Sequence, residues 1–339
     1  MSQNRSTDAA VDLNPSTIAV REIGSFHVGG KMHTLSRMAQ RDRPSTPGGP
    51  VYSSDPNGEI VAGQMYVQYV RLASPQSPHP LLCWHGGGMT GATWETTPDG
   101  RQGWQMFFLR AGFDVYVSDA VERGRSSWAP FPAVYADAPY FRTGREAWED
   151  VFRFGPPGSW HADPALRRAH EGMRFPVPYM DAFMKQFVPR WATNNALTQE
   201  AYDALIARLD SSVVMTHSQG GNFGLTAALH APDRVKAVVS IEPSGSPDPR
   251  AFDLASLRGV PHLFVWGDFL DHRPSLRLHS LPLVRAWSDA LTAAGVDVEW
   301  IDLPSRGIKG NSHALMCDDN SDEIAGLVLD WLKRHDLAT

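Results

Sequence analysis

Short apolar runs recur along this chain, and helical patterns separate most of them. Several runs are apolar almost throughout, which is typical of strands that a parallel sheet buries on both faces. Their lengths suit strands better than helices. We predict strands at residues 17–23, 64–72, 80–84, 114–118, 213–216, 235–241, 262–266 and 298–303.

Helical patterns fill most of the intervals, at residues 104–111, 199–209, 222–230, 283–294 and 321–335. In the last of them, Ile324, Val328 and Trp331 recur at the spacing of one helix face. Strands that alternate with helices along a chain predict an α/β fold. We therefore expect a mostly parallel central sheet that is flanked by helices.

The alternation stops between residues 122 and 196, where proline and aromatic residues crowd together. A structureless loop of that length is rare in a compact domain, so we predict an inserted cap over an active site. Residues 17–121 and 197–339 would then form the core. Residues 1–16 are polar and predict a flexible N-terminal tail, and residues 41–50 are rich in proline, glycine and serine and predict a loop.

Charge and composition exclude several classes of function. The 339 residues carry 31 Lys and Arg against 37 Asp and Glu, a net charge of −6, so no basic surface is available for nucleic acid. No apolar run approaches the roughly 20 residues of a membrane span. The start of the chain lacks a signal-peptide pattern, which predicts a cytoplasmic protein. With two cysteines and no metal-binding motif, we expect no disulfide scaffold, metal or cofactor.

One serine stands where an apolar strand gives way to a helix. Ser218 follows the strand at 213–216, with Thr216 before it and Gly220 after it. This context predicts a nucleophile elbow, the sharp turn that exposes a serine hydroxyl, although glycine is usual in place of Thr216. The alternative is a serine that only caps the helix, and the flanking strand favours the elbow.

A glycine run follows the strand at 80–84 and predicts an oxyanion hole. Backbone N–H groups in such a turn can face a developing negative charge. We expect the Gly87 N–H to be one donor and the Gln219 N–H to be the other. A phosphate cradle is the alternative, but neither the P-loop lysine pattern nor G-x-G-x-x-G is present.

The general base should be a histidine after the last strand, because chain order in this type of fold is serine, acid, histidine. His313 occupies that position. His335 lies at a helix end, and His217 adjoins the serine, where its side chain is expected to point elsewhere.

Two locations in the sequence could supply the acidic member of the triad. Glu242 follows the strand at 235–241, whereas Asp268 and Asp271 follow the strand at 262–266, which is the commoner location. A carboxylate at either place could orient the imidazole and stabilise the imidazolium.

Together these motifs resemble the α/β-hydrolases, and among them a small group of atypical bacterial esterases. The resemblance runs from about residue 23 onward. It is carried by the motifs at residues 85–88, 93–100, 123–126, 217–219, 241–243 and 311–313. It implies Ser218 as nucleophile, His313 as base, Glu242 as acid, and Gly87 with Gln219 as oxyanion hole. Some members carry adjacent cysteines after His-Gly, where this chain has Gly87 and Gly88. Other members resemble enzymes that de-esterify herbicide methyl esters.

These observations predict a cofactor-independent serine carboxylic ester hydrolase that acts on a small-molecule ester through an acyl-serine intermediate. An acyltransferase or lyase on the same fold stays open, as does a non-catalytic ligand receptor. Aromatic residues are dense in the cap and predict a preference for apolar or aromatic esters over charged ones. The sequence leaves a homodimer open.

Overall fold

A computed structural model describes residues 17–273 and 279–339. The predicted flexible tail, residues 1–16, lies outside the described residues. Within them, an eight-stranded sheet runs in the order β1-β4-β6-β5-β7-β8-β9-β10. Its strands are β1 Val20–Leu35, β4 Gly58–Leu72, β5 Leu81–Trp84, β6 Val115–Asp119, β7 Ser212–His217, β8 Val235–Ile241, β9 His262–Trp266 and β10 Val298–Asp302.

The sheet is parallel from β6 to β10, and only β1 and β4 pair with their neighbours in antiparallel orientation. The prediction of a mostly parallel sheet is therefore confirmed. The carboxyl ends of the parallel strands meet at one edge, which is where open α/β sheets place their ligands.

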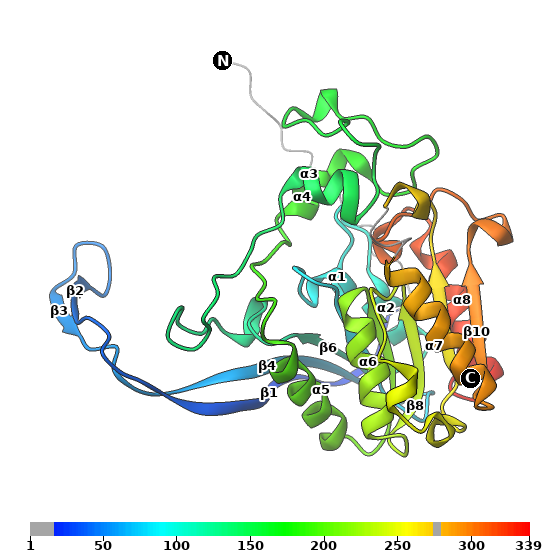
Figure 1. Cartoon of the computed structure of the whole chain (residues 1–339), viewed down its shortest axis with the longest axis horizontal. Coiled ribbons are helices and arrows are strands. Elements are labelled where there is room, and N and C mark those ends of the chain that lie inside the picture. Colours follow the sequence, from blue (N-terminus) through cyan, green and yellow to red (C-terminus); the bar gives the residue numbers. More distant parts are fainter. Residues whose placement is uncertain (1–16, 274–278) are drawn as a thin grey trace.

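Helices cover both faces of the sheet (Figure 1). One face packs against α2 Trp104–Arg110 and α8 Ser321–Arg334, and the other against α5 Asn195–Arg208, α6 Gln219–His230 and α7 Leu281–Ala293. The short α1 Ala92–Glu95 follows the glycine run after β5.

Strand β5 shows why its residues are apolar throughout. Leu81 and Cys83 belong to the hydrophobic cluster on the α2 and α8 face, while Leu82 and Trp84 belong to the cluster on the opposite face. Side chains alternate between the two faces of a strand, so a strand covered on both sides needs apolar residues at every position. The Cys83 thiol is buried and free, as expected for a small hydrophobic residue.

The prediction of a loop at residues 41–50 is wrong in part. Strand β2 Arg41–Pro44 pairs with β3 Val51–Ser54, and only the connection between them is a turn. This hairpin stands at the tip of the long β1–β4 ribbon, which reaches away from the body (Figure 1). Much of β1 is exposed, so it lacks the apolar run by which a buried strand is recognised.

The cap segment, residues 122–196, contains short helical turns and no strand of the main sheet. Its turns are η1 Gly124–Ser126, α3 Gly144–Glu146, η2 Ala147–Val151, η3 Pro164–Leu166, η4 Val177–Tyr179 and α4 Met180–Met184. Aromatic contacts join them: the Phe152 ring lies 4.9 Å from that of Phe183, and the Phe154 ring lies 3.9 Å from that of Phe175. These rings belong to the same hydrophobic cluster as the α2 and α8 face of the sheet, so they pack the segment onto the body of the molecule.

Candidate active site

Ser218 lies at the turn between β7 and α6, with φ 53° and ψ −114°. Positive φ is uncommon for a residue other than glycine and is typical of the strained nucleophile elbow. The Ser218 N–H donates to the carbonyl oxygen of Ile241 at 3.0 Å, which ties the turn to the end of β8. The backbone has the geometry that the sequence predicts here.

Small residues around the turn allow the start of α6 to approach the sheet closely. A Cβ on Gly220 would lie 2.9 Å from the carbonyl oxygens of Trp84 and His85. Thr216 replaces the usual first glycine of the motif, and its Cγ2 would lie only 2.6 Å from a Cβ on Gly224. Gly224 thus provides the space that the Thr216 methyl group needs. This explains how the turn accommodates a threonine where glycine is usual.

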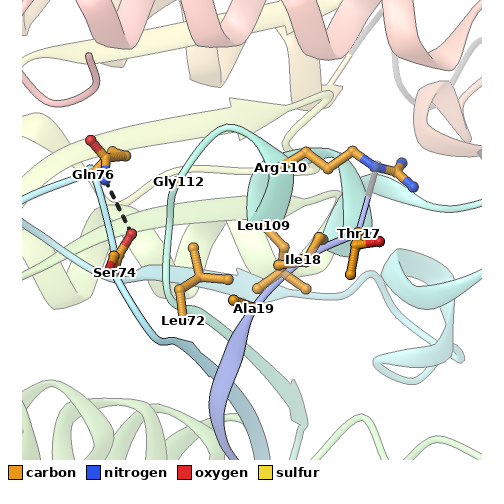
Figure 2. A pocket seen from close by; sticks show the side chains of 9 residues that line it. All are labelled: Thr17, Ile18, Ala19, Leu72, Ser74, Gln76, Leu109, Arg110 and Gly112. Carbon is orange, nitrogen blue, oxygen red and sulfur yellow. Dashed lines mark hydrogen bonds between the residues drawn. The ribbon is translucent and has the colours of Figure 1, made fainter. Parts of the chain in front are cut away.

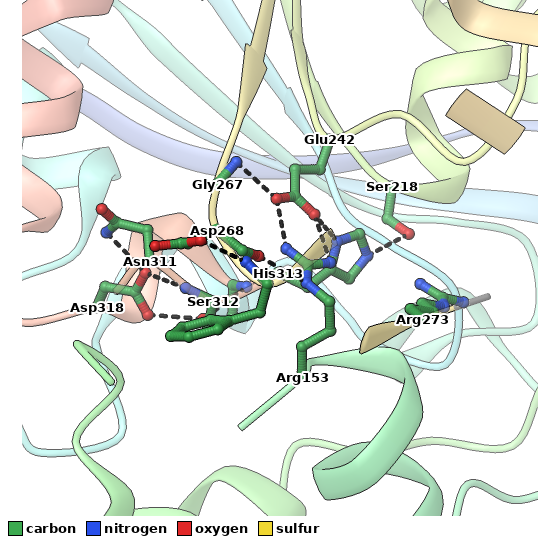
Figure 3. A network of polar contacts seen from close by, with 12 residues as sticks. Arg153, Ser218, Glu242, Gly267, Asp268, Arg273, Asn311, Ser312, His313 and Asp318 are labelled. Carbon is green, nitrogen blue, oxygen red and sulfur yellow. Dashed lines mark hydrogen bonds and ion pairs between the residues drawn. The ribbon is translucent and has the colours of Figure 1, made fainter. Parts of the chain in front are cut away.

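The three residues predicted as a triad lie within hydrogen-bond distance of one another (Figure 3). The Ser218 hydroxyl donates to His313 Nε2 at 2.9 Å, and His313 Nδ1–H donates to Glu242 Oε2 at 2.5 Å. His313 and Glu242 are fully buried, whereas Ser218 is partly accessible. The arrangement can move a proton from the hydroxyl to the imidazole and stabilise the imidazolium that results.

The two alternative acids take other positions. The Asp268 carboxylate accepts hydrogen bonds from the N–H groups of Phe269 and Gly310, at 2.7 and 2.9 Å, and so braces the loop that carries the histidine. Asp271 is exposed in the turn η7 Leu270–His272, away from the buried imidazole. The structure therefore brings Glu242, and neither aspartate, to His313.

A buried arginine that the sequence analysis missed holds the glutamate in place. Arg153 Nη1 and Nη2 donate to the two carboxylate oxygens of Glu242, at 2.9 and 2.6 Å, and both side chains are fully buried. Burial alone would raise the pKa of Glu242, but Arg153 and His313 outweigh it and hold that pKa well below its ordinary value. Arg153 lies in the irregular cap segment with φ 58°, where no periodic pattern marks it.

Replacing Arg153 is expected to destabilise the protein strongly. Arg153→Met leaves the Glu242 carboxylate buried without its cation, and breaking a buried pair in this way costs about 3–5 kcal/mol. Urea unfolding of Arg153→Met should therefore occur at a clearly lower midpoint than that of the wild type. The control is Arg145→Met, an exposed arginine of the same cap segment. Equal midpoints for wild type and Arg153→Met would contradict the assigned role of the pair.

A second buried carboxylate fixes the loop that carries the histidine. Asp318 accepts from Asn311 Nδ2 and the Ser312 N–H, both at 2.9 Å, and from the Ser312 hydroxyl at 2.7 Å. Burial raises the pKa of Asp318 to about 7, against these hydrogen bonds. The cap segment also contributes, because the His313 N–H donates to the carbonyl oxygen of Phe152. The position of the imidazole is thus held from both sides.

The expectation that the His217 side chain points away from the site is wrong. His217 Nε2–H donates to the carbonyl oxygen of His313 at 2.8 Å, and the two rings lie 4.7 Å apart. Burial is the main cause that lowers the pKa of His217 well below 6.5 and keeps the ring neutral. It lines the pocket beside Ser218, as a support for the histidine loop.

The pocket at Ser218 is small, and residues 142, 151 and 152 line part of it. Gly86 and Gly87 form one wall and Val151 and Phe152 another, and they leave almost no free volume for even a water molecule. Ligand pockets usually hold roughly 300–1,000 Å³, so side chains around Ser218 must shift before an ester can bind. Gln219 begins α6, and the first N–H groups of a helix have no partner within the helix.

The pH dependence of catalysis follows from the burial of the imidazole. Burial lowers the pKa of His313 to about 4, although the hydrogen bond to Glu242 opposes this. A general base acts when it is neutral. We therefore expect the acid limb of kcat/KM to lie below the ordinary histidine pKa of about 6.5, centred nearer pH 4. A series of kcat/KM values from acidic to neutral pH measures this. An acid limb centred above pH 7 would contradict the assignment.

A second pocket in the described structure lacks the acid–base groups found at Ser218. This separate pocket is formed by residues 17–19, the end of β4 and the end of α2 (Figure 2). At its edge, Gln76 Nε2–H donates to the carbonyl oxygen of Ser74. No histidine, cysteine or carboxylate lines it. Among the residues that are described, no cluster of histidine, cysteine and acidic side chains could hold a metal ion. In the same part of the chain, no helix is long and apolar enough to cross a membrane.

Comparison with known proteins gives the class of the chain. A family model for the alpha/beta hydrolase fold matches residues 79–271. The solved structure of a novel bacterial esterase is 33% identical, with a TM-score of 0.80 over 95% of this chain and 98% of that chain. A probable secreted lipase, phiG, of a fungus (Fungal sp. strain ATCC 74256) is 29% identical over 333 residues, which cover 80% of this chain and 86% of the relative.

The chain therefore belongs to the α/β-hydrolase family and is an enzyme of the esterase type. The fold predicted from the sequence is confirmed by these matches and by the sheet described above.

Proposed function

We propose that this protein is a serine carboxylic ester hydrolase in which Ser218 is the nucleophile, His313 the general base and Glu242 the acid. The hydrogen-bonded chain from the Ser218 hydroxyl through His313 to Glu242 carries the proposal. The similarity to a bacterial esterase over 95% of the chain supports it. No cofactor takes part in the proposed reaction.

In the first half-reaction, Ser218 Oγ attacks the carbonyl carbon of the ester while its proton passes to His313 Nε2. The carbonyl oxygen becomes an oxyanion, which the N–H groups of Gly87 and Gln219 would stabilise. His313 then gives the proton to the oxygen of the departing group. The carbon–oxygen bond of the ester breaks, an alcohol leaves, and the acyl group stays on Ser218.

In the second half-reaction, water takes the place of the alcohol. His313 accepts a proton from the water as its oxygen attacks the acyl carbon, and then returns that proton to Ser218 Oγ. A carboxylic acid leaves and the serine is restored. Throughout, Glu242 holds the imidazole with Nδ1 protonated, because Nδ1–H donates to the carboxylate, so Nε2 is the atom that accepts and returns the proton.

The substrate is proposed to have an apolar or aromatic body. Met89, Val151 and Phe152 line the pocket at Ser218, and apolar side chains of this kind bury the hydrocarbon part of a ligand. The predicted cytoplasmic location stays a prediction, since the similar fungal protein is named as secreted. A homodimer also stays open.

Product analysis separates this proposal from the other reactions open to the fold. The protein is incubated with aryl, alkyl and methyl esters, with and without an added alcohol or amine as acyl acceptor. We expect free carboxylic acid and alcohol as the main products in every case. Transfer of most acyl groups to the acceptor would indicate an acyltransferase, and no turnover of any ester would favour a receptor that retains the pocket.

A further inference from the structure

We propose that the pocket at Ser218 contains an anion-binding subsite formed by Arg142 and Arg190 of the cap segment. The preferred ester would then carry a negatively charged group, such as a carboxylate, a few bonds from its reacting carbonyl. This inference rests on the proposed esterase function and narrows its substrate class.

Arg142 lines the same pocket as Ser218 and His313. Its Nη1 donates to the carbonyl oxygen of Gly87 at 2.9 Å, and its side chain is 8% exposed. The Nε atom is buried and has no hydrogen-bond acceptor among the described residues. Glu146 Oε1 lies 3.9 Å from this atom, too far for a hydrogen bond, and its side chain is 39% exposed.

Arg190 also approaches the glycine run. Tyr140 and Arg190 form a β-bridge, which aligns the two segments that lead into and out of the cap. Arg190 Nη1 would lie 3.1 Å from a Cβ on Gly87 and donates to the Tyr140 hydroxyl. Its Nε is also buried without an acceptor in the part of the chain described. Two guanidinium groups thus approach the loop proposed as oxyanion hole.

The charge around the pocket is unbalanced in favour of cations. Arg153 is neutralised by the buried Glu242, and Arg273 lies 3.4 Å from Asp150. Among the described residues, the acidic side chain paired with Arg142 is the distant Glu146, and the side-chain hydrogen bond of Arg190 goes to a neutral hydroxyl.

The surroundings of Arg142 strengthen its attraction for an anion. Its guanidinium lies 5.4 Å from the Phe152 ring and 6.0 Å from the Phe187 ring. Charges interact more strongly among such apolar groups than in water. Burial lowers the pKa of Arg142, and Arg273 and Arg190 add to this effect, yet an arginine stays charged in proteins. A negatively charged group of the substrate would satisfy the free donors and reduce the repulsion between the cations.

The expectation that charged esters are disfavoured came from aromatic residues alone and took no account of these arginines. The two features are compatible in one substrate. An apolar or aromatic body would contact the phenylalanine rings while a carboxylate pairs with the guanidinium groups.

Matched ester pairs test the subsite from both sides of the ester bond. On the acyl side, the mono-4-nitrophenyl ester of glutarate is compared with 4-nitrophenyl pentanoate. On the alcohol side, 4-acetoxybenzoate is compared with 4-methylphenyl acetate. We expect wild-type kcat/KM to be at least about tenfold higher for the anionic member in one pair, because a hydrogen bond to a charged group contributes that much. This preference should weaken as salt is added.

The variant Arg142→Gln removes the charge and keeps a polar side chain of similar reach. It should lower kcat/KM for the preferred anionic ester about tenfold or more relative to its neutral match. Arg145→Gln, at an exposed arginine of the same cap segment, should keep the wild-type preference.

Two results would overturn the subsite while the esterase proposal stands. One is a wild-type enzyme that hydrolyses the neutral member of both pairs as fast as the anionic one, which needs no variant. The other is an equal loss for both members in Arg142→Gln, which would mean that Arg142 only supports the Gly87 loop. If no ester of either pair is hydrolysed, the proposed function itself fails and the subsite with it.

Discussion

Ser218→Ala is expected to reduce kcat for ester hydrolysis on the order of 10⁶-fold and to leave a folded protein. The hydroxyl is the proposed nucleophile, and its loss removes little packing because the side chain is partly accessible. Steady-state kinetics on an aryl ester measure the loss, and circular dichroism checks the fold. A variant that keeps a tenth of the wild-type turnover would show that another group attacks the ester.

His313→Ala should cause a loss of similar size, since the serine is a weak nucleophile without its base. When two residues act in the same step, removing either one already abolishes that step. The double variant should therefore be little less active than either single variant. Losses that multiply in the double variant would mean that Ser218 and His313 do not share a step.

Glu242→Gln is expected to lower kcat on the order of 10⁴-fold, by analogy with the Asp→Asn change in serine proteases. An amide at this position can no longer stabilise the imidazolium or hold the correct tautomer, although its shape is nearly the same. Because Arg153 also loses its counter-ion, stability must be measured beside activity, and kinetics should be recorded well below the unfolding midpoint.

The two aspartates supply the matched controls for this change. Asp268→Asn and Asp271→Asn should each cost far less activity, since the two ring nitrogens of His313 bond to Glu242 and Ser218 in the structure. The commoner acid position would be correct if Asp271→Asn abolished turnover while Glu242→Gln kept it. Both outcomes use one assay and one substrate.

The parts of this structure that the sequence predicts are those with a local physical signature. Strands β8 and β9 have the predicted bounds, because each is short, mostly apolar and almost wholly buried between the helices on the two faces. Helix α6 begins three residues before its predicted start, since Gln219 and the two glycines after it carry no helical signal of their own. The elbow at Ser218 was recognisable because strand, small residues and helix follow one another within a few positions.

The residues that escaped prediction act through contacts between distant segments. Arg153 pairs with Glu242 across 89 positions, and Arg142 bonds to Gly87 across 55. Both arginines lie in a segment without periodicity, where an arginine is by default a surface residue. The long β1–β4 ribbon was predicted only in part, at residues 17–23 and 64–72, because the rest of β1 is largely exposed and carries polar residues that resemble those of loops.

Peptide mapping after labelling with a fluorophosphonate tests the central claim, that Ser218 is a nucleophile activated by His313. Such a reagent bonds covalently to an activated serine. The account predicts one added label, located by mass spectrometry on the peptide that contains Ser218, and almost no labelling of His313→Ala under the same conditions. A label on a different residue, or an unlabelled Ser218 in an enzyme that is hydrolysing esters, would contradict it.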